Sequence, residues 1–497
     1  MQNYDYIVIG SGSAGSIVAG RLAANPELSV LLLEAGGEAS AYPKIWDPNQ
    51  INCLYDIPQI HWGYKSLPQV HMNNRIMDVW RAKMTGGCTA HNDMVYVRGA
   101  PADFDQWEID YGCIGWRYKD IAQNFARVEA VMQPTTTTKN AFGAAFVEAC
   151  EKLGYTYNPD YNSGANMFGV SPLRSTISKT FRRQTSYERY VIPLLATQKN
   201  LSVITNALVG HIEFDNKKRA RSVVFSIGGV AQRATAEKEI VLSAGAINSP
   251  QILMRSGIGD ANVLRKLGAQ VVMDLPGVGA NLMDALIFQG TWSSSQPITN
   301  QPVNEGYAIV WANMNAQGQA SNAVEMMRGK YTCGQSEAEL QGFYSVTGDM
   351  MRLQSRGAVT LRSLNPADAP LIDMNFLSHP DDYAECVKGF ELMRSIGNAP
   401  GLAAWRGKEL TPGPTVVTPA EIKSWILNNA WSLSHPVGTC RMGIGETAVV
   451  DAQLRVYGVS GLRVIDASIM PRITSGHTQG PSLMIGDKGA SMILAGP

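Results

Sequence analysis

The sequence is poor in the features that mark a specialised class of protein. Its 497 residues include 42 Lys+Arg and 42 Asp+Glu, so the net charge is zero. A balanced charge gives no electrostatic basis for binding nucleic acid or an anionic membrane surface. No run of about 18 apolar residues exists, so we expect no membrane span. An apolar stretch follows the first few residues and leaves no room for a signal peptide, so we expect a soluble, cytoplasmic protein.

Cysteine and histidine are also scarce. The seven cysteines are scattered and form no CxxC pair, which predicts neither a zinc site nor a disulfide framework, and no other metal site is expected. Histidine is the side chain best suited to proton transfer near neutral pH. Only seven positions offer it: His61, His71, His91, His211, His379, His435 and His477.

Glycine, in contrast, is abundant, with 48 residues and no collagen-like period. This favours many tight turns and close backbone approaches. A chain of this length is too long for one hydrophobic core, so two domains or one large composite domain are expected.

The stretch "YIVIGSGSAGSIVAGRLAANPELSVLLLEAGG" begins at Tyr6 and predicts a strand, a turn, a helix and a second strand. The predicted strands are 6–9 and 30–33, and the predicted helix is 16–24. Between them lie three glycines with the spacing of a dinucleotide-binding turn. The first permits the tight turn, the second lets a pyrophosphate approach the backbone, and the third lets helix and strand pack closely. The residues expected at this site are Gly10, Gly12, Ser13, Ala14, Gly15, Glu34 and Ala35.

Glu34 ends the second predicted strand, where a carboxylate accepts hydrogen bonds from ribose hydroxyls. The free N–H groups and the dipole of the helix N-terminus favour the pyrophosphate. The glycine motif by itself does not decide between NAD and FAD.

Further motifs resemble one protein family. "RAKMTGGCTAHNDMVYVRG" (81–99) and "GAINSPQILMRSGIG" (245–259) resemble the two signatures of the glucose–methanol–choline (GMC) flavoprotein oxidoreductases. "LPGVGANLMDA" (275–285), "SHPVGTCRMG" (434–443) and "VIDASIMPRITSGHTQGPSLMIGDKGA" (464–490) are similar to later segments of the same family, in the same order. The resemblance runs from residue 4 to residue 494.

This resemblance implies FAD as cofactor and an α/β (α+β) fold. It implies a discontinuous Rossmann-like FAD-binding domain, which we place at 1–155, 200–300 and 435–497. A substrate-binding domain on an antiparallel sheet is then expected at 156–199 and 301–434. "SRGAVTLRSLNPADAPLIDMNF" (355–376) has the alternation of an exposed-face strand that suits such a sheet.

Alcohol oxidation requires a base for the hydroxyl proton and an acceptor for the hydride, and flavin N5 is such an acceptor. The family resemblance assigns the base to His435 and a hydrogen-bonding partner of the substrate oxygen to His477. Two imidazoles that converge on this oxygen would share the stabilisation of its developing charge. The resemblance also assigns cofactor contacts to Arg81, Gly87, Asn92, Val95, Val209, Ala244, Gly245, Asp466, Ala467 and Thr478.

His91 replaces an apolar residue of the usual family pattern. The replacement is similar to choline oxidase, in which a histidine at this position is bonded to the 8α carbon of the flavin. The hypothesis is therefore FAD linked covalently through His91. The alternative is a histidine that packs there with a hydrogen bond to the backbone.

An aromatic pocket is expected from Trp62, Tyr64 and Trp431, and it favours small benzylic, furanic or pyridine-type primary alcohols. The sequence assigns no carboxylate to this pocket, so choline-like substrates are not favoured, although aromatic rings also suit a quaternary ammonium. The leading hypothesis is an oxidase that produces an aldehyde and hydrogen peroxide. Its expected partners are a small-molecule alcohol and oxygen or an artificial or quinone electron acceptor, with no nucleic acid and no membrane. The alternatives are a dehydrogenase of choline-type or aliphatic alcohols that uses a quinone or dye, and a hydroxynitrile lyase on the same fold. Monomer and homodimer both remain open.

Overall fold

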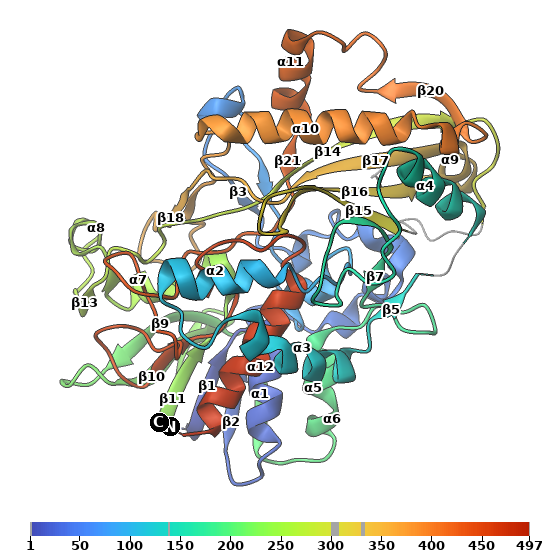
Figure 1. The fold of residues 1–497 in the computed structure, drawn as a ribbon. Coiled ribbons are helices and arrows are strands. Elements are labelled where there is room, and N and C mark those ends of the chain that lie inside the picture. Colours follow the sequence, from blue (N-terminus) through green and yellow to red (C-terminus); the bar gives the residue numbers. More distant parts are fainter. Residues whose placement is uncertain (1, 138–139, 300–307, 330–332, 497) are drawn as a thin grey trace.

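The computed structural model describes residues 2–137, 140–299, 308–329 and 333–496. Two seven-stranded sheets organise this part of the chain, one in the lower and one in the upper half of Figure 1. In the lower sheet, β1 (Gln2–Ile9) runs parallel to its two neighbours, β2 (Val30–Leu33) and β11 (Val230–Leu242). The remaining strands are β8 (Leu201–Ile204), β10 (Ala220–Ile227), β9 (Leu208–Phe214) and β22 (Leu462–Val464).

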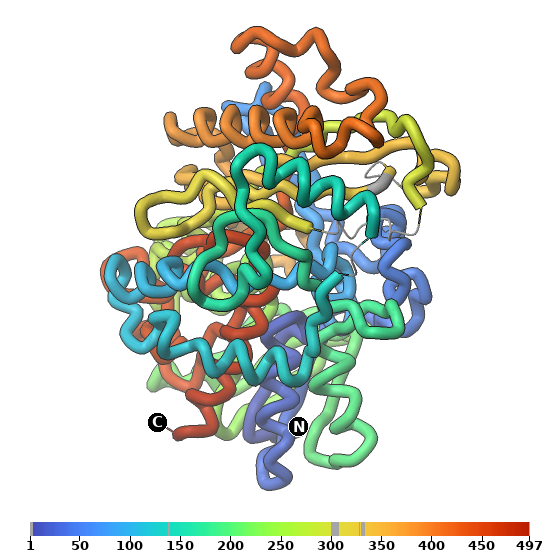
Figure 2. The backbone as a smooth tube through the Cα atoms, turned by 45° about the vertical axis from the view of Figure 1, so that its right-hand side comes forward, coloured from blue at the N-terminus to red at the C-terminus, as the bar shows by residue number. Residues whose placement is uncertain are grey.

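Helices cover this lower sheet because its strands are apolar on both faces, as in the fully buried run Val30–Leu33. Helix α1 (Ser13–Ala23) packs against α12 (Gln479–Leu494) and α5 (Ser186–Tyr190), and α12 packs against α3 (Tyr118–Met132). Figure 1 shows these helices side by side next to β1 and β2, so segments from both ends of the sequence form one layer. Both chain termini lie at the lower end of the molecule (Figure 2).

The upper sheet is antiparallel throughout. Its order is β20 (Arg406–Thr411), β14 (Leu286–Ser294), β17 (Phe343–Met350), β16 (Ala320–Arg328), β15 (Ala308–Met314) and β6 (Gly169–Pro172), with β21 (Trp431–Ser432) paired to β14. Helix α10 (Pro380–Gly397) lies across it and contacts β14, β16 and β17 (Figure 1). Helix α4 (Ala141–Lys152) contacts β6 and β15 and adds Phe142 to the aromatic core of this half.

Shorter elements connect these layers. The helices are α2 (Pro101–Tyr111), α6 (Ile192–Leu195), α7 (Gly245–Arg255), α8 (Ala261–Lys266), α9 (Glu337–Gly342) and α11 (Pro419–Asn429). The remaining strands pair two by two: β3 (Tyr64–Lys65) with β4 (Asp78–Val79), β5 (Thr135–Thr136) with β7 (Arg174–Ser175), β12 (Ile258–Gly259) with β13 (Met273–Asp274), and β18 (Ala358–Thr360) with β19 (Leu371–Asp373).

The predicted fold class is confirmed, because the structure combines a Rossmann-like sheet with an antiparallel one. The predicted helix begins at Ser13, three residues earlier than expected, and strand 6–9 is part of the longer β1. The segment 355–376 does form antiparallel strands, β18 and β19, but they make a separate two-stranded sheet and are not part of the seven-stranded one. The domain boundaries remain a prediction, although β14 and α4, which we placed with the FAD-binding domain, belong to the upper layer.

A disulfide joins Cys53 to Cys333, with their Cα atoms 4.7 Å apart. The sequence predicted no disulfide, and this prediction was wrong for one pair. The two cysteines are 280 residues apart, so no local spacing indicated the pairing. Of the helices in the described ranges, none is both long and apolar enough to cross a membrane.

Candidate active site

Two cavities meet at His477, which lines both of them. The first runs along the carboxyl ends of β1, β2 and β11, where nucleotides bind in sheets of this type. Every predicted cofactor residue except Gly15 lines this cavity: Gly10, Gly12, Ser13, Ala14, Glu34, Ala35, Arg81, Gly87, His91, Asn92, Val95, Val209, Ala244, Gly245, Asp466, Ala467 and Thr478.

The three glycines of the turn have different surroundings. A Cβ on Gly10, which has φ +99°, would lie 2.4 Å from the Ser243 carbonyl oxygen, and a Cβ on Gly15 would lie 1.9 Å from the Gly10 carbonyl oxygen. The protein itself therefore requires glycine at these two positions. A Cβ on Gly12 would meet only the Gly87 Cα, at 3.9 Å. The space beside Gly12 is thus left for a ligand that approaches the backbone.

Two helix N-termini and a carboxylate also line this first cavity, and together with the glycine turn they form a dinucleotide cradle. Helices α1 and α12 both begin at this cavity, and neither N-terminus is capped by a side chain. Uncapped N–H groups and the helix dipole favour the negative charge of a pyrophosphate. Glu34 accepts hydrogen bonds from the Ser11 backbone N–H at 3.0 Å and from its hydroxyl at 2.7 Å, which holds the carboxylate in place at the end of β2. The residues present therefore fit FAD.

The two predicted catalytic histidines contact each other. His435 follows β21 and His477 precedes α12, and the His477 Nδ1 lies 3.2 Å from the His435 Nε2. The other nitrogen of His477, Nε2, lies 2.8 Å from a carboxylate oxygen of Glu325 on β16. The three side chains thus form a chain of hydrogen bonds that ends at His435.

Burial and nearby charges shift the pKa values of the two imidazoles in opposite directions. Burial, together with the nearby His477 and Arg81, holds the pKa of His435 well below its usual value. Burial also acts to lower the pKa of His477, but the carboxylates of Glu325, Asp349 and Asp93 together outweigh it, so the pKa of His477 is raised. His435 is therefore the neutral member of the pair and His477 the protonated one, which suits a base and a hydrogen-bond donor.

The backbone at His435 is fixed by polar contacts. Asp284, just before β14, accepts hydrogen bonds from the His435 N–H at 2.7 Å and from the Ser432 hydroxyl at 2.5 Å. Ser434 has φ +63°, a strained value for a residue other than glycine, and its carbonyl accepts a hydrogen bond from Arg81. Burial raises the pKa of Asp284 to about 6.

His91 is 4% exposed and follows a 3₁₀ turn at Gly87–Ala90. Its ring lies 4.6 Å from that of His61 and 5.0 Å from that of Tyr55, measured between ring centroids. Burial, with smaller effects from His61 and Arg183, holds the pKa of His91 well below its usual value. Its Nε2 has no hydrogen-bond partner in the described part of the chain. His91 is therefore a neutral imidazole with one free nitrogen at the cofactor cavity.

The second cavity has a volume of about 560 Å³, within the usual range for small-molecule sites. Three aromatic residues line it, namely Tyr55, Trp80 and Trp431. The structure places the three predicted pocket residues apart, because Trp62 and Tyr64 line the first cavity and only Trp431 lines the second.

Carboxylates also line the second cavity, although the sequence assigned none to it. Glu325 and Asp349 lie on the neighbouring strands β16 and β17 and face this space. Each of these two strands ("ASNAVEMMR", "FYSVTGDM") has a single acidic residue, and this was the only sequence signal that could have indicated them.

A Rossmann-like sheet with a dinucleotide cradle, next to a histidine pair at a second cavity, defines a nucleotide-dependent oxidoreductase. Models of the GMC oxidoreductase family match residues 4–287 and 354–486, and the chain belongs to this family. It is accordingly an alcohol oxidoreductase of the FAD-dependent type.

Individual proteins show the same relationship. The chain is 35% identical to the oxygen-dependent choline dehydrogenase of Escherichia coli O17:K52:H18, over 99% of this chain and 95% of that relative. Its structure is similar to that of pyridoxine 4-oxidase from Mesorbium loti, with a TM-score of 0.91, 29% identity and full coverage of both chains. A formate oxidase shares the fold at 22% identity, with a TM-score of 0.90 over 99% of this chain and 98% of the other.

Proposed function

We propose that this chain oxidises small primary alcohols attached to an aromatic ring, with His435 as base, and that oxygen accepts the electrons. The observation that carries the proposal is the position of the His435–His477 pair, where the dinucleotide cavity meets a cavity with aromatic walls. Pyridoxine is itself a pyridine-type alcohol, so the similarity to pyridoxine 4-oxidase supports a ring of this kind.

The chain's own residues hold the cofactor and move the proton. The backbone at Gly12, Ser13 and Ala14 would hold the pyrophosphate, and Glu34 the ribose. FAD, when bound, supplies the acceptor for the hydride. The substrate hydroxyl enters between the two imidazoles and replaces their contact. His435 takes the hydroxyl proton at Nε2, and His477 donates a hydrogen bond to the same oxygen as the aldehyde forms.

The test is oxygen consumption and peroxide formation by the holoenzyme with a panel of benzylic, furanic, pyridine-type and aliphatic alcohols. We expect peroxide in equal amount to the oxygen consumed, with aromatic alcohols as the better substrates. Flavin reduction without oxygen uptake would favour the quinone- or dye-dependent dehydrogenase. Failure of every alcohol to bleach the flavin under anaerobic conditions would reject alcohol oxidation.

We further propose that His91 forms a covalent bond to the 8α carbon of FAD; an 8α C–H bond would be lost, its two electrons would reduce the flavin, and oxygen would reoxidise it. A nitrogen that is neutral, buried and without a hydrogen-bond partner supports this role, because it is free to act as a nucleophile. After acid precipitation, yellow colour should stay with the protein, and a fluorescent peptide should contain His91. Colour in the supernatant would reject the bond and leave His91 as a packing residue.

A further inference from the structure

The second cavity contains a buried carboxylate without a hydrogen bond. Asp349 on β17 is 1% exposed and lines this cavity. The Thr347 hydroxyl lies close enough to favour its charged form, but neither carboxylate oxygen accepts a hydrogen bond within the described ranges. Burial of such a group is costly unless something satisfies it, so the position calls for a ligand that donates hydrogen bonds.

Negative charges outnumber positive ones around Asp349, where His477 is the one cationic side chain among the described lining residues. Four carboxylates line the cavity: Asp56, Asp93, Glu325 and Asp349. Among the residues whose side chains are described, no lysine or arginine lines it, and the one histidine is His477. Carboxylates together with aromatic walls attract positively charged ligands.

A metal ion is a poorer fit than an organic cation. Glu325, Asp349 and one nitrogen of His477 come within 4.8 Å of one another. Both nitrogens of His477 are, however, engaged, one with Glu325 and the other with His435. This leaves no free imidazole to coordinate a metal.

We propose that the substrate alcohol carries a protonated amine or pyridinium group whose N–H donates a hydrogen bond to Asp349. This inference rests on the proposed function, since the hydroxyl of the same molecule must lie between His435 and His477. Burial, and then the charge of Glu325, raise the pKa of Asp349, and a bound cation opposes both effects. A quaternary ammonium such as that of choline has no N–H and would leave both Asp349 oxygens without a donor.

Three alcohols of similar shape test the proposal on the unmodified holoenzyme: 3-(aminomethyl)benzyl alcohol, its trimethylammonium analogue and 3-ethylbenzyl alcohol. We expect kcat/KM for the amine to exceed that of either other alcohol at least about 10-fold, the scale of a hydrogen bond to a charged group. Equal values for the amine and the neutral alcohol, or for the amine and the quaternary compound, would overturn the proposal.

A substitution of Asp349 then tests whether this residue is the group that binds the cation. Asp349→Asn removes the charge, and the preference for the amine over the neutral alcohol should fall at least about 10-fold, mostly through a higher KM. The matched control is Asp110→Asn on α2, an exposed carboxylate outside the cavity, which should leave the preference unchanged. An unchanged preference in Asp349→Asn would overturn the assignment, and if this variant does not fold, the three-alcohol comparison still decides.

The two proposals fail in different ways. If the neutral alcohol reduces the flavin as well as the amine does, alcohol oxidation stands and only the cationic substrate is rejected. If none of the three alcohols reduces the flavin anaerobically, both proposals are overturned.

Discussion

Under the proposed function, turnover should depend most directly on His435, because its Nε2 is the neutral nitrogen next to His477. His435→Ala should lower the anaerobic rate of flavin reduction by alcohol more than about 100-fold, the usual scale for a general base. His71→Ala, which removes an exposed imidazole, is the control and should not change the rate. Near-normal reduction by His435→Ala would exclude His435 as the base.

Glu325 should act through His477, and its effect should appear in the pH profile. The proposed mechanism requires neutral His435, which exists above its lowered pKa, and protonated His477, which exists below its raised pKa. Activity should therefore be lost on the acid side through His435 and on the alkaline side through His477.

In Glu325→Gln the carboxylate that raises the pKa of His477 is gone, so the alkaline limb of kcat/KM should move to lower pH. Asp349 and Asp93 also raise the pKa of His477, and their effects remain in this variant. The acid limb should shift much less. An alkaline limb at the same pH in both proteins would show that Glu325 does not control this proton.

The family resemblance singled out His435 and His477, and the structure places these two side chains in contact, while their catalytic roles remain a prediction. The sequence was not sufficient to predict Glu325 or Asp349, whose strands carry no motif. These carboxylates reach the site only through the pairing of β16 with β17. The sequence also could not predict that Trp62 and Trp431 line different cavities, since the cavity that a ring faces depends on packing between distant elements.

At the scale of elements, the glycines of the turn before α1 have different roles: Gly12 leaves space for the cofactor, and Gly15 is required by the fold. Gly12→Ala meets no chain atom closer than 3.9 Å, so the melting temperature of flavin-free protein should hardly change, while the flavin content falls. Gly15→Ala, the matched comparison, places a methyl group against the Gly10 carbonyl and should destabilise the protein by about 1–3 kcal/mol. Full flavin content in Gly12→Ala would contradict our placement of the pyrophosphate.

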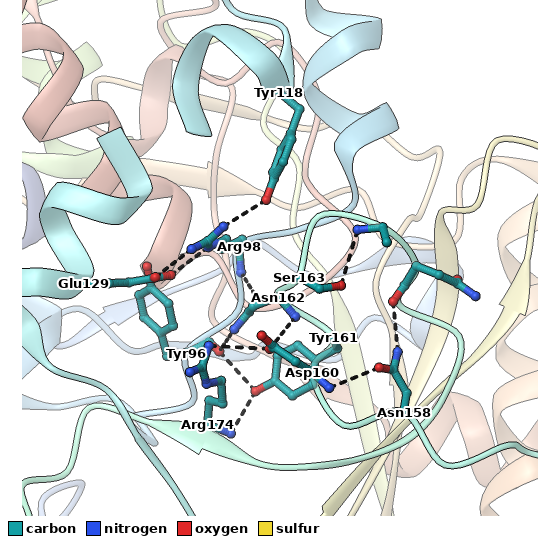
Figure 3. A network of polar contacts seen from close by, with 12 residues as sticks. Tyr96, Arg98, Tyr118, Glu129, Asn158, Asp160, Tyr161, Asn162, Ser163 and Arg174 are labelled. Carbon is teal, nitrogen blue, oxygen red and sulfur yellow. Dashed lines mark hydrogen bonds and ion pairs between the residues drawn. The ribbon is translucent and has the colours of Figure 1, made fainter. Parts of the chain in front are cut away.

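A polar network connects α3 to the chain beside it (Figure 3). Arg98 donates to both carboxylate oxygens of Glu129 at 2.6 Å and to the Tyr118 hydroxyl at 3.0 Å, and its backbone N–H donates to Asn162 at 2.7 Å. Glu129→Gln should lower the free energy of unfolding by about 1.5–3 kcal/mol, since charged hydrogen bonds in a mostly buried site are lost.

The comparison for this ion pair is Lys65→Met, because the Lys65–Asp78 pair is solvent-exposed. Its loss should cost less than about 1 kcal/mol. Urea unfolding of both variants distinguishes the two cases, and equal losses would show that the network of Figure 3 contributes no more than a surface pair.

Elements with a strong local pattern were predictable. The run Val30–Leu33 and the glycine turn indicated β2 and the presence of α1, though not the residue at which α1 begins, because an apolar run and a fixed spacing are properties of neighbouring residues. The sheet to which segment 355–376 belongs was not predictable, because an alternating pattern indicates a strand but does not specify the sheet that the strand joins.

At the scale of the whole molecule, the two-sheet architecture followed from the family resemblance rather than from composition. The Cys53–Cys333 disulfide illustrates what sequence reasoning missed, since it depends on the arrangement of both halves. It joins the segment before Tyr55, at the second cavity, to the connection between β16 and β17.

The order of strands in the lower sheet has a consequence for synthesis on the ribosome. The first strand made, β1, receives β11 only after residue 242 has been added, and β22 joins β11 after residue 464. Helix α12, which covers α1, is translated after all of these strands. The emerging N-terminal segment must therefore remain incomplete, with apolar strand surface exposed, during most of translation. The need of this protein for chaperones should consequently depend on the time that passes between the synthesis of β1 and the synthesis of β22, the first and last strands of the lower sheet.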